Sequence, residues 1–126
     1  MEKFEINVVT TLTVTAEDID DIMCSALENG ICYWCREARV VGDYLGEYAS
    51  EQISRGGKLI LVDAEEGVEF ELTREKLLSG IKQAREEEVF KDYNWWDGDT
   101  IDTCSVDADV ADAIVQFALF DEIIFG

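Results

Sequence analysis

The first third of the chain changes its hydrophobic period twice. Residues 4–14 alternate between apolar and polar side chains, which predicts a strand with one buried face. Thr15 and Asp18 then resemble a capping box, and apolar residues recur every three or four positions up to Gly30, so we expect a helix over 16–29. Residues 31–41 are rich in aromatic and β-branched types and predict a second strand.

The remainder of the chain predicts a hairpin and two further helices. Residues 43–57 are interpreted as a loop carrying a helical turn, and residues 58–72 as a hairpin that turns at 65–67. Thr73 and Asp107 are expected to cap helices, separated by an irregular aromatic segment over 89–105. The last helix has a wide apolar arc, which indicates a central position, and residues 123–126 are expected to form an edge strand or to pack on a partner.

This order of elements indicates an α+β fold. We expect a single domain over residues 1–126, with about four to five largely antiparallel strands and three helices packed on one face. Hydrophobic residues make up 48% of the chain, which is enough to form a core despite the high charge.

The net charge of the chain and its distribution say more about possible partners than any motif does. The chain has 29 acidic and 10 basic residues, a formal net charge of −19, and no histidine. Residues 1–35 hold seven acids and one base, and residues 92–126 hold nine acids and no base. Such ends repel nucleic acid and attract basic protein surfaces or cations, so direct nucleic-acid binding is disfavoured.

Nothing in the sequence resembles a membrane span or a signal peptide. No apolar run approaches the roughly 20 residues that a transmembrane helix needs, and the first residues lack a charged segment followed by an apolar one. We therefore expect a cytoplasmic protein without membrane contact, in which the four cysteines are reduced thiols.

The segment "GICYWCREARV" raises the question of a metal or redox site. If residues 31–41 form one strand, Cys32 and Cys35 point to opposite faces and share neither a disulfide nor a metal ion. A redox pair would stand at the start of a helix, which is not the case here. We therefore interpret both as core residues and expect no metal site. A zinc site formed by all four cysteines, listed as Cys24, Cys32, Cys35 and Cys104, remains an alternative.

The motifs of the common enzyme classes are incomplete. "ISRGGK" lacks the first glycine and the Ser or Thr of a phosphate loop, and "DYNWWDGDTID" lacks the ligand spacing of a calcium loop. Without histidine, the Ser-His and Cys-His nucleophile systems are excluded. We expect no catalytic residue, no cofactor and no enzymatic activity. A Mg²⁺-dependent enzyme using Asp97, Asp99 and Asp102 is the one enzyme class left open.

Two acidic rows and a tryptophan pair are the candidate partner-binding residues. Acids on the polar side of the first helix form one row, and acids of the last helix form the second. Of two adjacent tryptophans in an extended segment, one faces outward and can anchor an interface. The set comprises Glu17, Asp20, Asp21, Glu28, Trp95, Trp96, Asp97, Asp99, Asp109 and Asp112.

At "EDIDDIM", "VVGDYLGEYASEQISRGG" and "ADAIVQFALFDEIIFG" the chain resembles a family of small acidic proteins of unassigned function, common in Firmicutes genomes, phages and mobile elements. The resemblance covers most of the chain and carries no known site residue. It implies a setting in which small acidic proteins include inhibitors of host defence, such as anti-CRISPR and anti-restriction proteins, some of which imitate the phosphates of nucleic acid.

The leading hypothesis is therefore a non-enzymatic acidic binding protein. Its expected partner is the basic surface of another protein, such as a nucleic-acid-binding host defence protein. A solvated face that only keeps the protein soluble is the competing interpretation of the same acids. A third hypothesis is a protein that sequesters a small nucleotide signal in a basic pocket built from Arg36, Arg39, Arg55 and Lys58. A homodimer through residues 123–126 is also expected.

Overall fold

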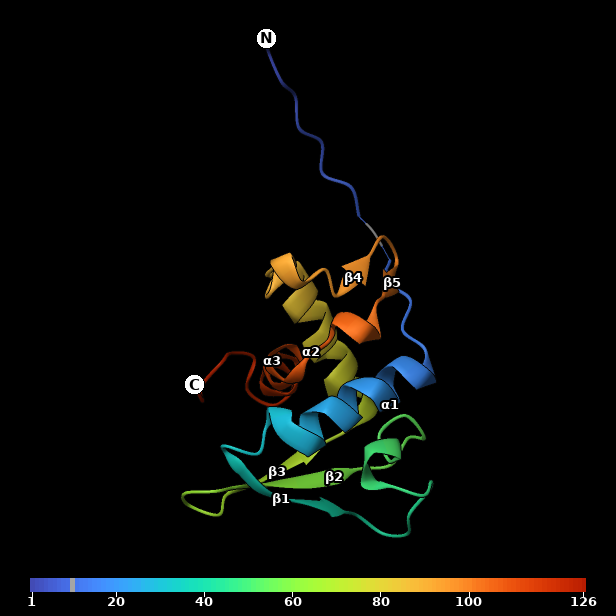
Figure 1. Ribbon diagram of the computed structural model, residues 1–126, viewed down its shortest axis with the longest axis vertical. Coiled ribbons are helices and arrows are strands. Elements are labelled where there is room, and N and C mark those ends of the chain that lie inside the picture. Colours follow the sequence, from blue (N-terminus) through green and yellow to red (C-terminus); the bar gives the residue numbers. More distant parts are fainter. Residues whose placement is uncertain (10) are drawn as a thin grey trace.

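The computed structural model describes residues 1–9 and 11–126. It has three α-helices and two antiparallel sheets, of three and two strands (Figure 1), so the α+β class is confirmed. In chain order the elements are α1 (Ala16–Ser25), the π-turn η1 (Ala26–Gly30), β1 (Cys35–Val40), the 3-10 turn η2 (Ala49–Glu51), β2 (Leu59–Asp63), β3 (Glu69–Leu72), α2 (Arg74–Glu86), η3 (Lys91–Tyr93), β4 (Trp96–Asp97), β5 (Thr100–Ile101), η4 (Thr103–Ser105) and α3 (Ala108–Phe120).

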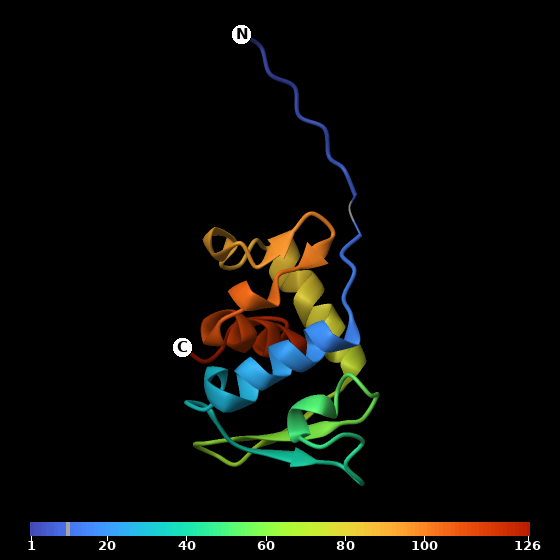
Figure 2. The same ribbon diagram turned by 45° about the vertical axis from the view of Figure 1, so that its right-hand side comes forward.

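The larger sheet has the order β1-β2-β3, with each neighbouring pair antiparallel. Figures 1 and 2 show this sheet at one end of the molecule and the helices above it. Direct contacts join α3 to β3 and α1 to η2. That all three helices pack on one face of the sheet stays a prediction. Strands β4 and β5 form a separate two-residue ladder on the far side of the helices.

Local capping explains where the helices begin. The Thr15 hydroxyl accepts from the Asp18 N–H, and the Asp18 carboxylate accepts from the Thr15 N–H, both at 3.0 Å, so the expected capping box is confirmed. Thr73 and Asp107 cap α2 and α3 in the predicted way. Each cap satisfies a backbone N–H that the first turn leaves without a partner.

Helix α3 is surrounded by other elements, as its wide apolar arc predicts. It packs against α2, η1, α1 and β3, and seven of its residues are buried. Its approach to α2 is close because Gly80 has no side chain, and a Cβ there would fall on the backbone of Ile114. The helix therefore forms the centre of the core, with Ile22, Leu61 and Leu77 among the fully buried side chains around it.

The prediction of a strand over 4–14 is wrong for the described residues. Residues 1–9 and 11–12 belong to no strand, and Thr13 alone makes an isolated parallel bridge, to Thr100. Thr10, also in the expected strand, lies outside the described residues. The apolar face of residues 4–8 is exposed instead of buried. Alternation specifies an extended backbone with two different faces, but it does not supply a neighbouring strand.

The second strand begins later than predicted. Backbone bonds from the N–H groups of Trp34 and Cys35 to the Ile31 carbonyl, at 3.0 and 2.8 Å, hold residues 31–35 in a turn that follows η1. Cys32 is exposed in this turn, whereas Cys35 is 7% exposed at the start of β1. The interpretation as core is thus correct for Cys35 and wrong for Cys32, since Cys32 is not in the strand.

The C-terminal segment is not an edge strand. Phe125 stacks on Trp34 with ring centroids 4.7 Å apart and rings 2° from parallel, and it also contacts Phe120. The N–H groups of Ile124 and Phe125 donate to the Gln116 side-chain oxygen at 2.9 and 2.8 Å. The segment is therefore held by its own chain.

Candidate functional site

The ion pairs of the described residues are confined to one part of the chain. In the part of the chain that the structure describes, six ion pairs are present, and all of them join bases and acids of residues 36–91, for example Arg39 with Glu37 and Lys58 with Glu71. Within residues 1–9 and 11–126, no ion pair includes an acid of α1 or of residues 92–126. The negative charge of these two segments is therefore not neutralised by the protein itself.

The fold brings the two acidic segments together. The Thr103 hydroxyl of η4 donates to the Asp21 carboxylate of α1 at 3.0 Å, and the Thr13 N–H donates to the Asp99 carbonyl at 2.6 Å. Figures 1 and 2 show η4 beside α1 in both views. The exposed carboxylates of this region are called the acidic surface and comprise Glu17, Asp21, Asp97, Asp99 and Asp102. From sequence, Asp102 was a candidate only for the Mg²⁺ alternative and not for partner binding, because only the fold places its loop beside α1.

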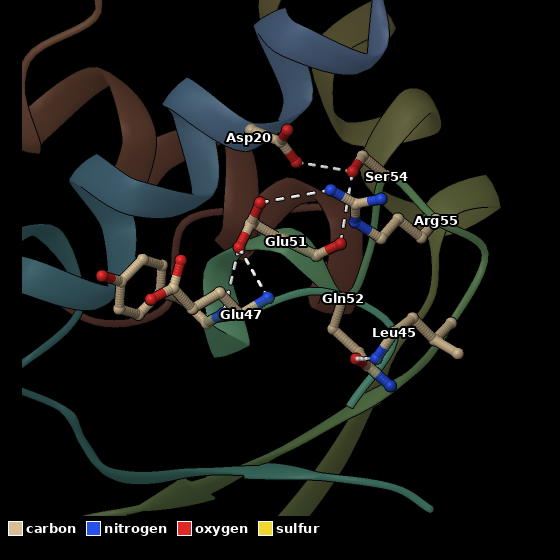
Figure 3. Close-up of polar contacts among 8 residues, drawn as sticks. Asp20, Leu45, Glu47, Glu51, Gln52, Ser54 and Arg55 are labelled. Carbon is tan, nitrogen blue, oxygen red and sulfur yellow. Dashed lines mark hydrogen bonds and ion pairs between the residues drawn. The ribbon is translucent and has the colours of Figure 1, made fainter. Parts of the chain in front are cut away.

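The other acidic candidates lie elsewhere. Asp20 is partly buried and accepts from the Ser54 hydroxyl at 2.5 Å, so it faces the loop before β2 (Figure 3). Glu28 is exposed and accepts from the Cys24 thiol at 3.3 Å. Asp109 is exposed in the first turn of α3. These three do not join the acidic surface.

Asp112 is committed to contacts within the fold. One of its oxygens accepts from the Tyr33 hydroxyl at 2.6 Å, and the other accepts from the Trp34 indole at 2.8 Å and from the Gln116 amide at 2.9 Å. Trp34 is 3% exposed and Gln116 is fully buried. Asp112 therefore holds the turn after η1 against α3, and we do not assign it to a binding surface.

Tyr33 shows the electrostatic effect of this arrangement. The residue as a whole is 55% exposed, but its hydroxyl points toward Asp112 and Gln116. Desolvation of the hydroxyl, followed by the hydrogen bond to the Asp112 carboxylate, raises the pKa of Tyr33 to about 12. Tyr33 therefore stays protonated and neutral over the physiological pH range.

A pocket of about 570 Å³ adjoins this network. Tyr33, Phe90 and Phe125 contribute aromatic walls, and Asp109 contributes an exposed carboxylate. Aromatic faces with a nearby carboxylate suit a cationic side chain such as that of Arg or Lys. This pocket was not apparent from sequence, because its walls come from four separate segments.

The tryptophan pair divides as predicted into an inner and an outer residue, but neither is a free anchor. Trp95 is fully buried and its indole N–H donates to the Val89 carbonyl at 2.8 Å. Trp96 is partly exposed, and the Arg85 guanidinium lies over its ring at 4.5 Å from the centroid. Arg85 already supplies the cation–π contact that a partner would make.

The loop before β2 is fixed by a polar network that sequence reasoning missed (Figure 3). The Glu51 carboxylate accepts from the N–H groups of Glu47 and Tyr48 at 2.9 and 3.0 Å, and it pairs with Arg55 at 3.2 Å. The Tyr48 N–H first, and then Arg55, lower the pKa of Glu51. Gln52, which is 1% exposed, also holds the loop in place.

Gln52 bridges the two ends of this loop. Its oxygen accepts from the Leu45 N–H (Figure 3), and its amide donates to the Asp43 carbonyl, both at 3.1 Å. Tyr44 and Tyr48, each 61% exposed, are therefore presented on an ordered loop. The glycines and polar residues of this segment predict a loop, but periodicity does not show which side chains close it.

The four cysteines are free thiols in separate surroundings. Cys32 donates to the Leu27 carbonyl at 3.4 Å, and Cys35 to the Glu37 carbonyl at 3.2 Å. Desolvation raises the pKa of Cys35, and the hydrogen bond to Glu28 raises that of Cys24. Among the residues that the structure describes, no group of three or more Cys, Asp or Glu side chains is placed to hold a metal ion, and this includes the zinc and Mg²⁺ alternatives.

The basic residues of the nucleotide-pocket hypothesis are dispersed. Arg39, Arg55 and Lys58 each pair with glutamates, and Arg36 lies over the hairpin turn at Gly67. A phosphate-binding pocket needs several cations that point into one cavity. The arrangement gives that hypothesis no support.

Comparisons with known proteins leave the site as the sole guide to function. In the part of the chain that the structure describes, no helix has the length and apolar character needed to cross a membrane. No family model, no curated protein and no solved structure matches this chain.

Proposed function

We propose that this chain is a non-enzymatic, cytoplasmic binding protein that uses its acidic surface to bind the basic, nucleic-acid-binding surface of another protein. A nuclease or other host defence protein fits this description. The carboxylates then occupy positions that nucleic-acid phosphates occupy in the partner's own complex.

Charge separation is the observation that carries the proposal. The chain has enough bases to pair with a third of its acids, yet all of them except Lys3 lie on the sheet, on α2 and in the adjoining loops. A surface evolved only for solubility needs no such segregation, because interspersed charges of both signs also keep a protein soluble. A single-sign surface steers an oppositely charged partner and increases the association rate.

The acidic surface is also held in place. Glu17 and Asp21 are one helical turn apart, about 6 Å along the axis of a capped helix. The Thr103 bond to Asp21 fixes η4 beside that helix. Carboxylates on such a scaffold lose little conformational freedom when a partner binds, which favours affinity.

The test is a pull-down from bacterial lysate at low and high salt, followed by competition with duplex DNA. We expect a nuclease or nucleic-acid-binding protein to be retained at low salt, and to be released by high salt or by DNA. Retention that DNA does not weaken, or no such protein at low salt, would contradict mimicry of nucleic acid.

Charge variants separate the acidic surface from net charge. The triple variant Glu17→Gln, Asp21→Asn, Asp99→Asn removes three charges from the surface. The matched control Glu65→Gln, Glu66→Gln, Glu87→Gln removes three exposed charges from the hairpin turn and the end of α2. We expect the first to lose the partner and the second to keep it. Equal loss in both would show that only net charge matters.

A further inference from the structure

The first nine residues form an extended arm with an unpartnered apolar face. Phe4, Ile6 and Val8 alternate along it and are 86%, 84% and 70% exposed. No hydrogen bond joins residues 1–9 to residues 11–126, and Figures 1 and 2 show the arm directed away from the body. An extended segment with free backbone groups and one apolar face is a template for pairing with another chain.

A groove of about 760 Å³ lies at the root of this arm. Its apolar lining comes from the root of the arm and from one face of α2, where Leu78 is 38% exposed. Lys82 and Arg85 of α2 are also in the lining. The arm groove is defined by Val8, Val9, Thr11, Leu12, Val14, Leu78, Ile81, Lys82, Arg85, Glu86 and Gly98.

The length of the arm determines whether its apolar residues can occupy the groove of their own chain. Val8 already lines the groove of its own chain, and Phe4 is four residues further, about 13 Å along an extended backbone. Phe4 and Ile6 therefore extend past the groove of their own chain. Each chain carries both the apolar face of the arm and the groove. Two copies related by a two-fold axis can therefore bury both faces and both grooves at once.

Charge favours the arm groove as the site of self-association. The chain carries −19, but α2 has four bases and two acids, a net charge of +2. Glu2 lies on the same side of an extended arm as Phe4 and Ile6. A second arm in the groove would place this carboxylate near Lys82 and Arg85, whereas contact between the acidic surfaces of two copies would bring acid against acid.

We propose that two copies of this protein form an arm-exchanged dimer, in which Phe4 and Ile6 of each copy occupy the arm groove of the other. The two arms run antiparallel, as a two-fold axis requires. The proposal does not rest on the proposed function, because it is argued from residues 1–9 and the arm groove and not from the carboxylates of the acidic surface.

The test is the mass of the full-length chain in solution, measured by light scattering over a concentration series. We expect wild type at twice 14.2 kDa. The variant Phe4→Ser, Ile6→Ser changes the apolar face, and Leu78→Ser changes the groove; both should be monomers with unchanged circular dichroism. The control Glu5→Ser, Asn7→Ser changes the opposite face of the arm and should stay a dimer. A monomeric wild type, or a dimer that survives the Phe4 and Ile6 changes, overturns the proposal.

A mixed-label NMR sample distinguishes exchange from folding back. In an equimolar mixture of ¹³C-labelled and unlabelled chains, isotope-filtered contacts between Ile6 and Leu78 should connect different chains. Contacts seen only within one chain would overturn the proposal even if a dimer is present.

Discussion

The variant Asp112→Ala gives the sharpest test of how this fold is held together, because the Asp112 carboxylate accepts hydrogen bonds from three donors and the variant removes it. The Trp34 indole N–H loses its acceptor, although Trp34 is only 3% exposed. Tyr33 and Gln116 each keep another partner, the Phe125 carbonyl, at 3.2 Å. The main loss is therefore one buried donor without an acceptor, together with two charge-assisted bonds.

The magnitude follows from these contacts. A buried unsatisfied donor costs about 1–3 kcal/mol, and loss of the bonds to a charged acceptor raises the total to roughly 2–4 kcal/mol. For 126 residues the entropy of unfolding is about 0.26 kcal/mol per kelvin, so the melting temperature should fall by roughly 8–15 °C. The assay is urea unfolding and a thermal melt, both followed by circular dichroism.

The matched control is Asp109→Ala, one turn earlier on α3. Its side chain is exposed and makes no hydrogen bond to residues 1–9 or 11–126, so we expect a loss under about 1 kcal/mol, from the helix dipole alone. Equal losses for the two variants would refute the view that Asp112 acts through its three donors.

Three further predictions test other parts of the structure. The pKa of Tyr33 is raised to about 12 in the folded protein, whereas the unfolded chain releases this proton near pH 10. The contribution of Tyr33 to stability should therefore be complete below pH 10 and lost as the pH rises through 12. The difference in unfolding free energy between wild type and Tyr33→Phe, measured across this range, checks it. Gly80→Ala should destabilise by about 1–3 kcal/mol in urea unfolding although Ala favours helices, because the new Cβ meets the Ile114 carbonyl oxygen. Timed maleimide labelling with mass spectrometry should modify Cys32 well before Cys35, since Cys35 is buried and its pKa is raised by desolvation; equal rates would contradict this.

Local signals predicted the helices well. Thr15, Thr73 and Asp107 mark helix starts because a cap is formed between residues three positions apart. The hairpin over 58–72 is also local, since β2 and β3 are joined by a short turn. These elements need no knowledge of distant parts of the chain.

Predictions that depended on distant partners succeeded less often. Residues 4–8 have the pattern of a half-buried strand, but a strand also needs a neighbour, and the described chain gives one only to Thr13. Asp112 was assigned to an exposed row because of its charge, whereas its donors are 78 and 79 residues away in sequence. Sequence spacing contains no information on such contacts.

The sequence by itself determined the α+β class, the helix starts, the central position of α3 and the concentration of acids at the two ends, because these depend on composition or on residues a few positions apart. The tertiary structure alone decided that the loop carrying Asp102 and Thr103 lies beside the acids of α1, that Asp112 is taken up by internal donors, and that Phe4 and Ile6 stay exposed beyond the arm groove. Each of these depends on which distant segments meet, and that is set by the packing of the whole core.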